Sequence, residues 1–263
     1  MTAEARKVRT GRILPFAIPW ESIPWWALIL GIVGVFVGWS VLTSEAYLDA
    51  LGFIVDGVKL TLQVTIISYL IGLVVGLIFG LMRVSDNPIF YAASTLYVEV
   101  MRGVPLLVII LYMGFVVTPR LREATGGQVD LQGVPAAILG IAICYGAYMA
   151  EVYRGGIESI EHGQMEAARS LGMNYMQAMR HVILPQAIRR ILPPLGNNLI
   201  SMLKDSSLIS VIALNDLLQT GRLYVSRTYR AFEGYNSVAL LYLTMTLFLS
   251  LIVRIVERKA AIE

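Results

Sequence analysis

The residues most able to do chemistry are charged side chains set within long apolar stretches. Glu151 ends an apolar run that begins at Val134, and Lys204 and Asp205 interrupt a run from Ile191 to Leu218. If these runs cross a bilayer, each charge costs roughly 2.5–3.5 kcal/mol at the centre of the membrane. We therefore expect each of them to have a defined partner or a role in moving a solute.

Two interpretations of Glu151 follow from its position. Its carboxylate could face a central cavity and attract the α-ammonium group, or a cationic side chain, of a substrate. It could instead pair with Arg154, which lies three residues further on and hence on the same helix face. The spacing leaves both interpretations open.

A structural or gating role is favoured for two further pairs of charges. Adjacent helical residues point about 100° apart, so Lys204 and Asp205 do not simply neutralise each other. One or both must meet another helix, a water-filled cavity or a symmetry-related subunit. Glu99 and Arg102 are three residues apart on one helical face, and we interpret them as a pair of the same kind.

Two amides follow a pair of prolines in the fifth apolar run. Asn197 and Asn198 lie just beyond Pro193-Pro194. They could satisfy backbone groups that the prolines leave free, or they could line a solute pathway. We keep both as candidate pathway residues.

The sequence lacks the motifs of common catalytic and cofactor sites. It contains no H-E-x-x-H and no G-x-S-x-G motif, which makes an enzyme remote. Cys144, His162 and His181 are its only cysteine and histidines, so a metal site is not expected. No G-x-x-x-x-G-K-[ST] motif is present, so the chain cannot bind ATP in the P-loop manner. We predict no catalytic residue, no metal and no cofactor in this chain.

Composition places these residues in an integral membrane protein. Of the 263 residues, 57% are hydrophobic and 15% charged, and the mean hydropathy is +0.69. Apolar runs long enough for a bilayer predict six transmembrane helices and no soluble catalytic domain. The runs are Pro24 to Leu42, Leu60 to Met82, Leu96 to Thr118, Val134 to Val152, Ile191 to Leu218 and Ser237 to Val253.

The distribution of basic residues predicts that both termini lie in the cytoplasm. Cytoplasmic loops are enriched in Lys and Arg, and this orientation places most of these residues inside. The exception is the predicted outer loop from Asn215 to Gly234, which is fairly basic. Within the second run, Gly72, Gly76 and Gly80 recur every four residues and predict a face for close helix packing.

The long predicted cytoplasmic segment between Arg154 and Arg190 carries an amphipathic pattern. Its apolar residues at helical spacing are Met165, Ala168, Leu171, Tyr175, Met176 and Met179. Gly172 interrupts the pattern, at a cost of about 1 kcal/mol relative to alanine, and indicates a bend or a close backbone approach. Pro185 and Pro193-Pro194 predict helix stops. The pattern fits a helix on the membrane surface, or two short helices that insert into a groove of a cytoplasmic partner.

The order of motifs in this segment resembles the EAA loop of permeases from bacterial ABC importers. Glu166-Ala167-Ala168 is followed by Gly172 and then by Val182-Ile183-Leu184-Pro185, with valine where the family usually has isoleucine. The resemblance implies that the loop docks on a separate ATPase. The residues it assigns to this coupling are Glu166, Ala167, Ala168, Arg169, Leu171 and Gly172.

Further pieces resemble the polar amino acid permeases, the branch with histidine, glutamine, arginine and glutamate systems. They are Gly57–Leu62, Glu99–Leu107, Gly146–Ile157, Leu184–Ala187 and Lys204–Leu208. By this resemblance, residues 56–258 form an all-α membrane domain of the type I ABC-importer permease fold. Residues 1–55, with the first predicted helix, are additional to a five-helix core.

The resemblance also implies an assembly in the bacterial cytoplasmic (inner) membrane. Two ATPase subunits would bind ATP and Mg²⁺. A second permease subunit, identical or paralogous, would complete the translocation pathway. An extracytoplasmic binding protein would deliver an amino acid. No nucleic acid is implied. Six membrane helices with charges would also fit an ATP-independent secondary transporter or channel, and an ABC permease for another solute, such as methionine, phosphonate or a metal, remains an alternative.

Overall fold

The computed structural model describes residues 31–262 except 33, 36–37 and 42. All regular structure that is assigned in these residues is helical, as the apolar runs predict. Asp49–Glu263 forms one compact unit, and the description below concerns this unit. The predicted first transmembrane helix, Pro24 to Leu42, falls largely outside the described residues.

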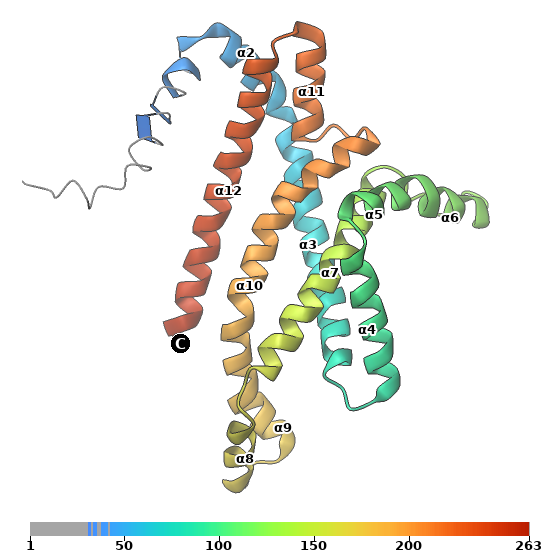
Figure 1. Ribbon diagram of the computed structural model, residues 1–263, viewed down its shortest axis with the longest axis vertical. Coiled ribbons are helices and arrows are strands. Elements are labelled where there is room, and N and C mark those ends of the chain that lie inside the picture. The colour runs from blue at the N-terminus through green and yellow to red at the C-terminus, as the bar shows by residue number, and fades with distance from the viewer. Residues whose placement is uncertain (1–30, 33, 36–37, 42, 263) are drawn as a thin grey trace, which may run out of the picture. The chain divides into compact units, whose positions relative to one another are not determined.

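The helices from Glu45 onward follow one another with short connections (Figure 1). Two π-helical turns, η2 and η3, and one 3-10 helix, η4, interrupt the α-helices. In chain order the elements are α2 (Glu45–Ile54), α3 (Asp56–Arg83), α4 (Pro88–Gly103), α5 (Leu106–Tyr112), η2 (Met113–Val117), α6 (Thr118–Ala124), α7 (Val134–Glu158), α8 (His162–Ser170), α9 (Tyr175–Ala178), η3 (Met179–Ile183), α10 (Leu184–Asp205), η4 (Ser206–Ile212), α11 (Leu217–Thr228) and α12 (Ala231–Ile262).

Three described helices are long and apolar enough to cross a membrane. They are Glu45–Arg83, Val134–Glu158 and Ala231–Lys259. A fourth candidate consists of Pro88–Gly103 with Leu106–Ala124, which are bent by 101° at the break between them. The third apolar run is therefore not one straight helix, because Pro105 disfavours helical geometry at the residue before it. The number of membrane crossings stays a prediction.

The prediction of helix stops at the prolines is wrong. Pro185 is the second residue of α10 and directly follows the π-helical turn η3, so the chain is helical on both sides of it, and α10 continues through Pro193 and Pro194. Helices α3, α7 and α12 pack against α10, and such packing tolerates proline inside a membrane helix. The predicted single run to Leu218 is also broken, since α10 ends at Asp205 and η4 follows.

Helices α3 and α7 are packed backbone to backbone, which confirms the predicted glycine face. A Cβ atom added to Gly76 would lie 2.6 Å from the Cβ of Met149, and one added to Gly80 would lie 2.8 Å from the Cβ of Tyr153. Real Cβ atoms essentially never come so close. The glycines therefore set the separation of the two helices.

Side-chain hydroxyls of α3 and α4 donate hydrogen bonds to carbonyl oxygens of α7. Ser68 Oγ of α3 donates to the carbonyl of Ile138 at 3.1 Å, and Tyr97 Oη of α4 donates to that of Ile143 at 2.6 Å. Both acceptors belong to α7. Because hydrogen bonds between helices satisfy polar groups where water is scarce, α3, α4 and α7 form a well-connected group that positions the side chains at its ends.

Candidate functional site

Helices α8 and α9 form a hairpin that protrudes from the rest of the unit. Figure 1 shows it beyond the ends of α7 and α10, on the side where α12 ends. We call residues His162–Ile183 the hairpin below. It contains every residue that the sequence assigns to coupling.

Gly172 makes the turn of the hairpin. Its φ angle is +85°, in the left-handed region that favours glycine. The N–H of Met173 donates to the carbonyl of Ala168 at 3.2 Å, and that of Gly172 donates to the carbonyl of Arg169 at 3.0 Å. These two bonds are a Schellman motif, which ends α8 and satisfies its last carbonyls. The predicted bend is present, and its cause is backbone conformation.

Asn174 starts the second arm of the hairpin, a role that sequence reasoning missed. Its Oδ1 accepts from the N–H of Gln177 at 2.8 Å, and Gln177 Oε1 accepts from the N–H of Asn174 at 2.9 Å. This reciprocal pair is a capping box. The sequence signal for this cap is Asn174 followed three residues later by Gln177, which is the spacing of a capping box.

The apolar residues of the hairpin divide into an inner and an outer set. Ala168 is 4% exposed and Ala178 is fully buried, so small side chains lie where the hairpin packs. Leu171, Tyr175 and Met176 are 81%, 59% and 69% exposed. Of the two alternatives for this segment, one continuous surface helix is wrong and a pair of short helices is present, because the chain reverses at Gly172. The other predicted coupling residues, Glu166, Ala167 and Arg169, are also exposed.

Glu151 lies at the centre of a charge cluster formed by α3, α4 and α7. Its two carboxylate oxygens accept from Arg154, at 2.8 Å from Nη2 and 3.1 Å from Nε. Arg83 Nη1 lies 3.2 Å from the same carboxylate and Arg102 Nη1 lies 3.8 Å from it. Three guanidinium groups therefore surround this carboxylate, and the contact with Arg154 is the one that the i, i+3 spacing offers.

Glu99 and Arg102 each contact a residue on another helix. Glu99 Oε1 lies 3.5 Å from Arg83 Nη2, while Arg102 meets Glu151 and lies over the ring of Tyr148 at 5.7 Å. None of the ion pairs found in the described residues joins Glu99 to Arg102, which corrects the expected pairing. Arg83 was missed, although a basic residue closing an apolar run is a usable signal.

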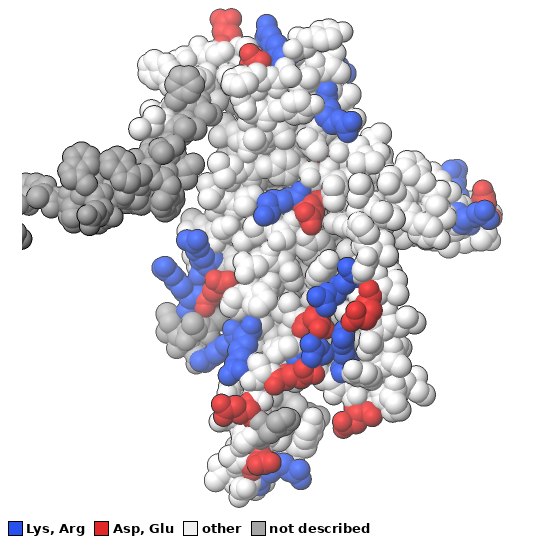
Figure 2. All heavy atoms as spheres, in the orientation of Figure 1, with Lys and Arg blue, Asp and Glu red and all other residues white. Residues whose placement is uncertain are grey.

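Asp205 and Lys204 have different surroundings. Tyr145 Oη of α7 donates to Asp205 Oδ2 at 2.7 Å, so the acid pairs with another helix. Lys204 is exposed. Figure 2 shows a small isolated patch of basic and acidic side chains in a broad uncharged surface, between the charges at the two ends.

The two candidate pathway amides differ in exposure. Asn197 is exposed, and Asn198 is partly buried. The side-chain nitrogen of Asn198 is buried and has no hydrogen-bond partner. A role for Asn198 in satisfying backbone groups therefore has no support from its nitrogen, and the pathway role stays a prediction.

Three comparisons with known proteins agree with one another. The family model for binding-protein-dependent transport system inner membrane components matches residues 68–262. The glutamine transport system permease protein GlnP of Escherichia coli strain K12 is 36% identical over 218 residues, which are 83% of this chain and 97% of that protein. The arginine transport system permease protein ArtQ of Bacillus subtilis strain 168 is 33% identical over 220 residues, 83% and 97% of the two chains.

A solved structure is similar in the same way. The crystal structure of an amino acid ABC transporter with histidines contains a chain that is 39% identical, with a TM-score of 0.72, over 81% of this chain and 96% of that one. The resemblance to ABC-importer permeases and the type I permease fold predicted from the sequence are thereby confirmed. The chain belongs to the family of binding-protein-dependent transport system inner membrane components, the membrane-spanning transport subunits of ABC importers.

Proposed function

We propose that this chain is the permease subunit of an ATP-driven importer for polar amino acids. Relatives named for glutamine and arginine transport align over almost their whole length, which supports this substrate class. The observation that carries the proposal is the protruding hairpin with its exposed apolar tip. Family membership removes the reason to prefer a secondary transporter or channel.

The hairpin is proposed to dock on the ATPase. Leu171, Tyr175 and Met176 offer three large apolar side chains to a partner, and such side chains act as anchors when they fill a groove. The Schellman turn at Gly172 and the capping box at Asn174 hold the tip in one geometry. A preorganised tip loses less conformational entropy on docking. It also transmits a movement of the ATPase to the membrane helices without first deforming itself.

The proposed orientation follows from the hairpin. Figure 1 shows the hairpin on the same side as the end of α12 and the connection between α3 and α4. If the hairpin meets a cytoplasmic ATPase, the C-terminus is cytoplasmic too, and α11 belongs to the outer side. We place the N-terminus inside as well, from the basic residues that precede the first apolar run.

The proposed assembly contains two ATPase subunits, a second permease subunit and an extracytoplasmic binding protein. ATP and Mg²⁺ bind to the ATPase. Within the chain, residues 56–258 act as the membrane domain and residues 1–55 as an addition to it. Asn197 and Asn198 are proposed to line the pathway. Glu151, Glu99 and Arg102 are proposed to hold the ends of α3, α4 and α7, and Lys204 and Asp205 to act at a gate.

Purification of the tagged chain from its native membrane tests the docking. In mild detergent, a P-loop ATPase should co-purify with the wild type and be lost with Leu171→Asp, which puts a charge at the exposed tip. Leu121→Asp is the matched control, because Leu121 of α6 is an exposed leucine outside the hairpin. A stable wild-type complex without an ATPase, or equal loss in both variants, would contradict the proposal.

A further inference from the structure

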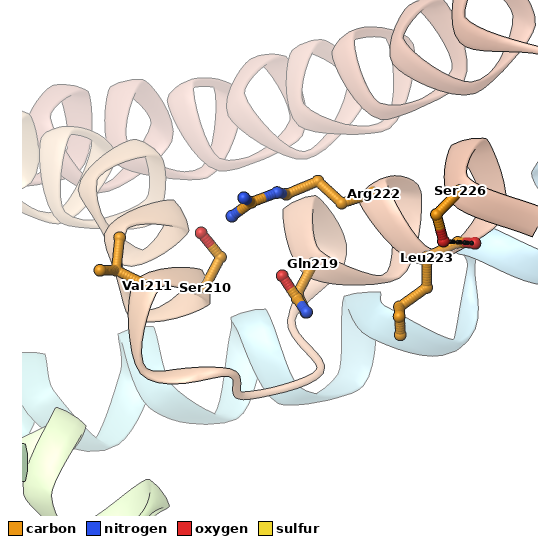
Figure 3. A pocket seen from close by; sticks show the side chains of 6 residues that line it. All are labelled: Ser210, Val211, Gln219, Arg222, Leu223 and Ser226. Carbon is orange, nitrogen blue, oxygen red and sulfur yellow. Dashed lines mark hydrogen bonds between the residues drawn. The ribbon is translucent and has the colours of Figure 1, made fainter. Parts of the chain in front are cut away.

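A polar cavity lies between η4 and α11, away from the hairpin and the charge cluster. Its volume is about 480 Å³, within the usual range of small-molecule sites, about 300–1,000 Å³. Figure 3 shows side chains of both elements facing the same space. The lining residues are Ser210, Val211, Gln219, Arg222, Leu223 and Ser226.

The sequence places the four α11 residues on one helix face. Gln219, Arg222, Leu223 and Ser226 follow the i, i+3, i+4, i+7 spacing of such a face. The start of the helix is fixed by Asp216, whose side chain accepts from the N–H groups of residues 218 and 219. Gln219 is thus held at the first turn, beside the cavity.

The opposite face of α11 is buried and anchors the helix. Leu217 and Tyr224 are 0% and 2% exposed and belong to one apolar cluster with Val238 of α12. A Cβ atom added to Gly221 would lie 2.3 Å from Val238 Cγ2. Because α11 cannot rotate without breaking this packing, its polar face is a fixed wall of the cavity.

Within the described residues, this wall holds one buried polar atom without a partner and one exposed cation without an ion pair. Gln219 Oε1 is buried and has no hydrogen-bond partner, and such groups normally have one. Arg222 takes part in none of the ion pairs found among the described residues. In Figure 3 its guanidinium group points across the cavity towards Ser210.

The charge of this region also needs an explanation. Arg222, Arg227 and Arg230 lie on or just after α11, on the proposed outer side, where basic residues are disfavoured. Arg227 lies over the ring of Phe53 at 5.2 Å, so it has a partner within the chain. Arg222 is left as the cation that faces the cavity.

We propose that this cavity is a subsite for the zwitterionic head group of an amino acid. Arg222 binds the α-carboxylate, since a guanidinium group matches a carboxylate in a two-pronged geometry. The hydroxyl of Ser210 accepts from the α-ammonium group, and Gln219 Oε1, which is buried in this structure, becomes a second acceptor when its side chain turns into the cavity. A carboxylate from a protein partner would satisfy Arg222 but would leave the oxygen of Gln219 without a donor. The inference rests on the proposed function and adds a site at the outer end of the pathway.

Thiol labelling inside the cavity tests this subsite in the complete complex. Cys144 is the only cysteine of the chain, so Cys144→Ser with Ser226→Cys places one thiol at the cavity wall. The complex in right-side-out vesicles is treated with a membrane-impermeant maleimide, with and without L-glutamine or L-arginine. We expect the amino acid to slow labelling, and its α-amide, which lacks the carboxylate, to protect at least about tenfold less well.

Matched variants locate the effect. Arg222→Gln should raise the concentration for half-maximal protection about tenfold or more, while Arg227→Gln should leave it unchanged. Co-purification of the ATPase with Arg222→Gln checks that the variant is assembled, and Gln219→Leu provides a second, uncharged test of the same site. A thiol at the exposed position of Tyr229 should show no protection.

The outcomes separate this subsite from the proposed function. If the complex with its binding protein imports none of the common L-amino acids, the proposed function fails and the subsite with it. If import occurs but protection is absent, or is equal in wild type, Arg222→Gln and Gln219→Leu, the subsite alone is refuted. If Arg222→Gln abolishes docking of the binding protein but leaves protection unchanged, the cavity serves the protein partner and the subsite is again refuted.

Discussion

Replacing Gly172 by alanine should weaken docking of the ATPase without disturbing the membrane domain. A Cβ atom at this position would meet nothing within 4 Å, so steric crowding does not contribute. The cost comes from the backbone, because φ is +85° and the left-handed region costs an L-residue roughly 1–2 kcal/mol. The variant turn can relax while the hairpin is free and must regain its native geometry on docking. Docking of the variant is therefore less favourable than docking of the wild type by this conformational cost.

The expected size of the effect follows from this penalty. A change of about 1–2 kcal/mol corresponds to roughly a 5–30-fold change in an equilibrium. In proteoliposomes, the ATPase concentration for half-maximal substrate-stimulated ATP hydrolysis should rise by that factor in Gly172→Ala. The amount of variant inserted in the membrane should equal that of the wild type, since the hairpin protrudes from the packed helices.

Gly163→Ala is the matched control for this prediction. Gly163 belongs to α8 of the same hairpin, and a Cβ atom there would also meet nothing within 4 Å. Its φ angle is not positive, so alanine should be neutral or slightly stabilising. Equal ATPase affinity for the two variants would refute the assigned role of the turn. So would failure of Gly172→Ala to insert in the membrane.

Three further changes probe the helices behind the hairpin. Glu151→Gln removes the negative charge that the guanidinium groups of Arg154, Arg83 and Arg102 surround. Because loss of one partner leaves partly buried charges unpaired, the melting temperature of the complex and its substrate-stimulated ATP hydrolysis should both fall when measured on the same preparation. Unchanged values would contradict the role of Glu151 in holding α3, α4 and α7 together. Tyr145→Phe removes the hydroxyl that donates to Asp205 and should lower the free energy of unfolding by about 1.5–3 kcal/mol. An unchanged free energy of unfolding in a denaturation experiment would show that this hydrogen bond does not stabilise the fold. Gly76→Leu should prevent accumulation of the folded subunit, and normal expression with a normal melting temperature would show that α3 and α7 need not touch.

The helical architecture and the hairpin turn could be predicted because each depends on local sequence. Apolar runs of membrane length show where helices lie, and Gly172 marks the break between α8 and α9. The spacing of Gly72, Gly76 and Gly80 shows which face of α3 meets another helix, although it does not reveal that α7 is the partner. Local rules of this kind need no knowledge of the rest of the fold.

Predictions failed where packing between distant segments outweighs local propensity. Pro193 and Pro194 would break an isolated helix, yet α10 runs through them because other helices surround it. The fifth apolar run reads as one helix, but it breaks after Asp205. The side chain of Asp205 meets Tyr145, which lies 60 residues away in the chain. No spacing rule within one helix can identify such a partner.

The contacts of Glu151 bear on how the importer would distinguish its substrates. Sequence spacing shows only Arg154, and a carboxylate with one partner could still attract a cationic substrate. With Arg83 and Arg102 added from two other helices, the carboxylate is surrounded by positive groups and presents no free negative charge. The acids Glu99 and Glu158 then balance the remaining guanidinium groups. A neutral cluster of this composition attracts cationic and uncharged amino acids about equally, so selection between them has to come from groups that contact the substrate side chain, which neither this cluster nor a head-group subsite beside α11 provides.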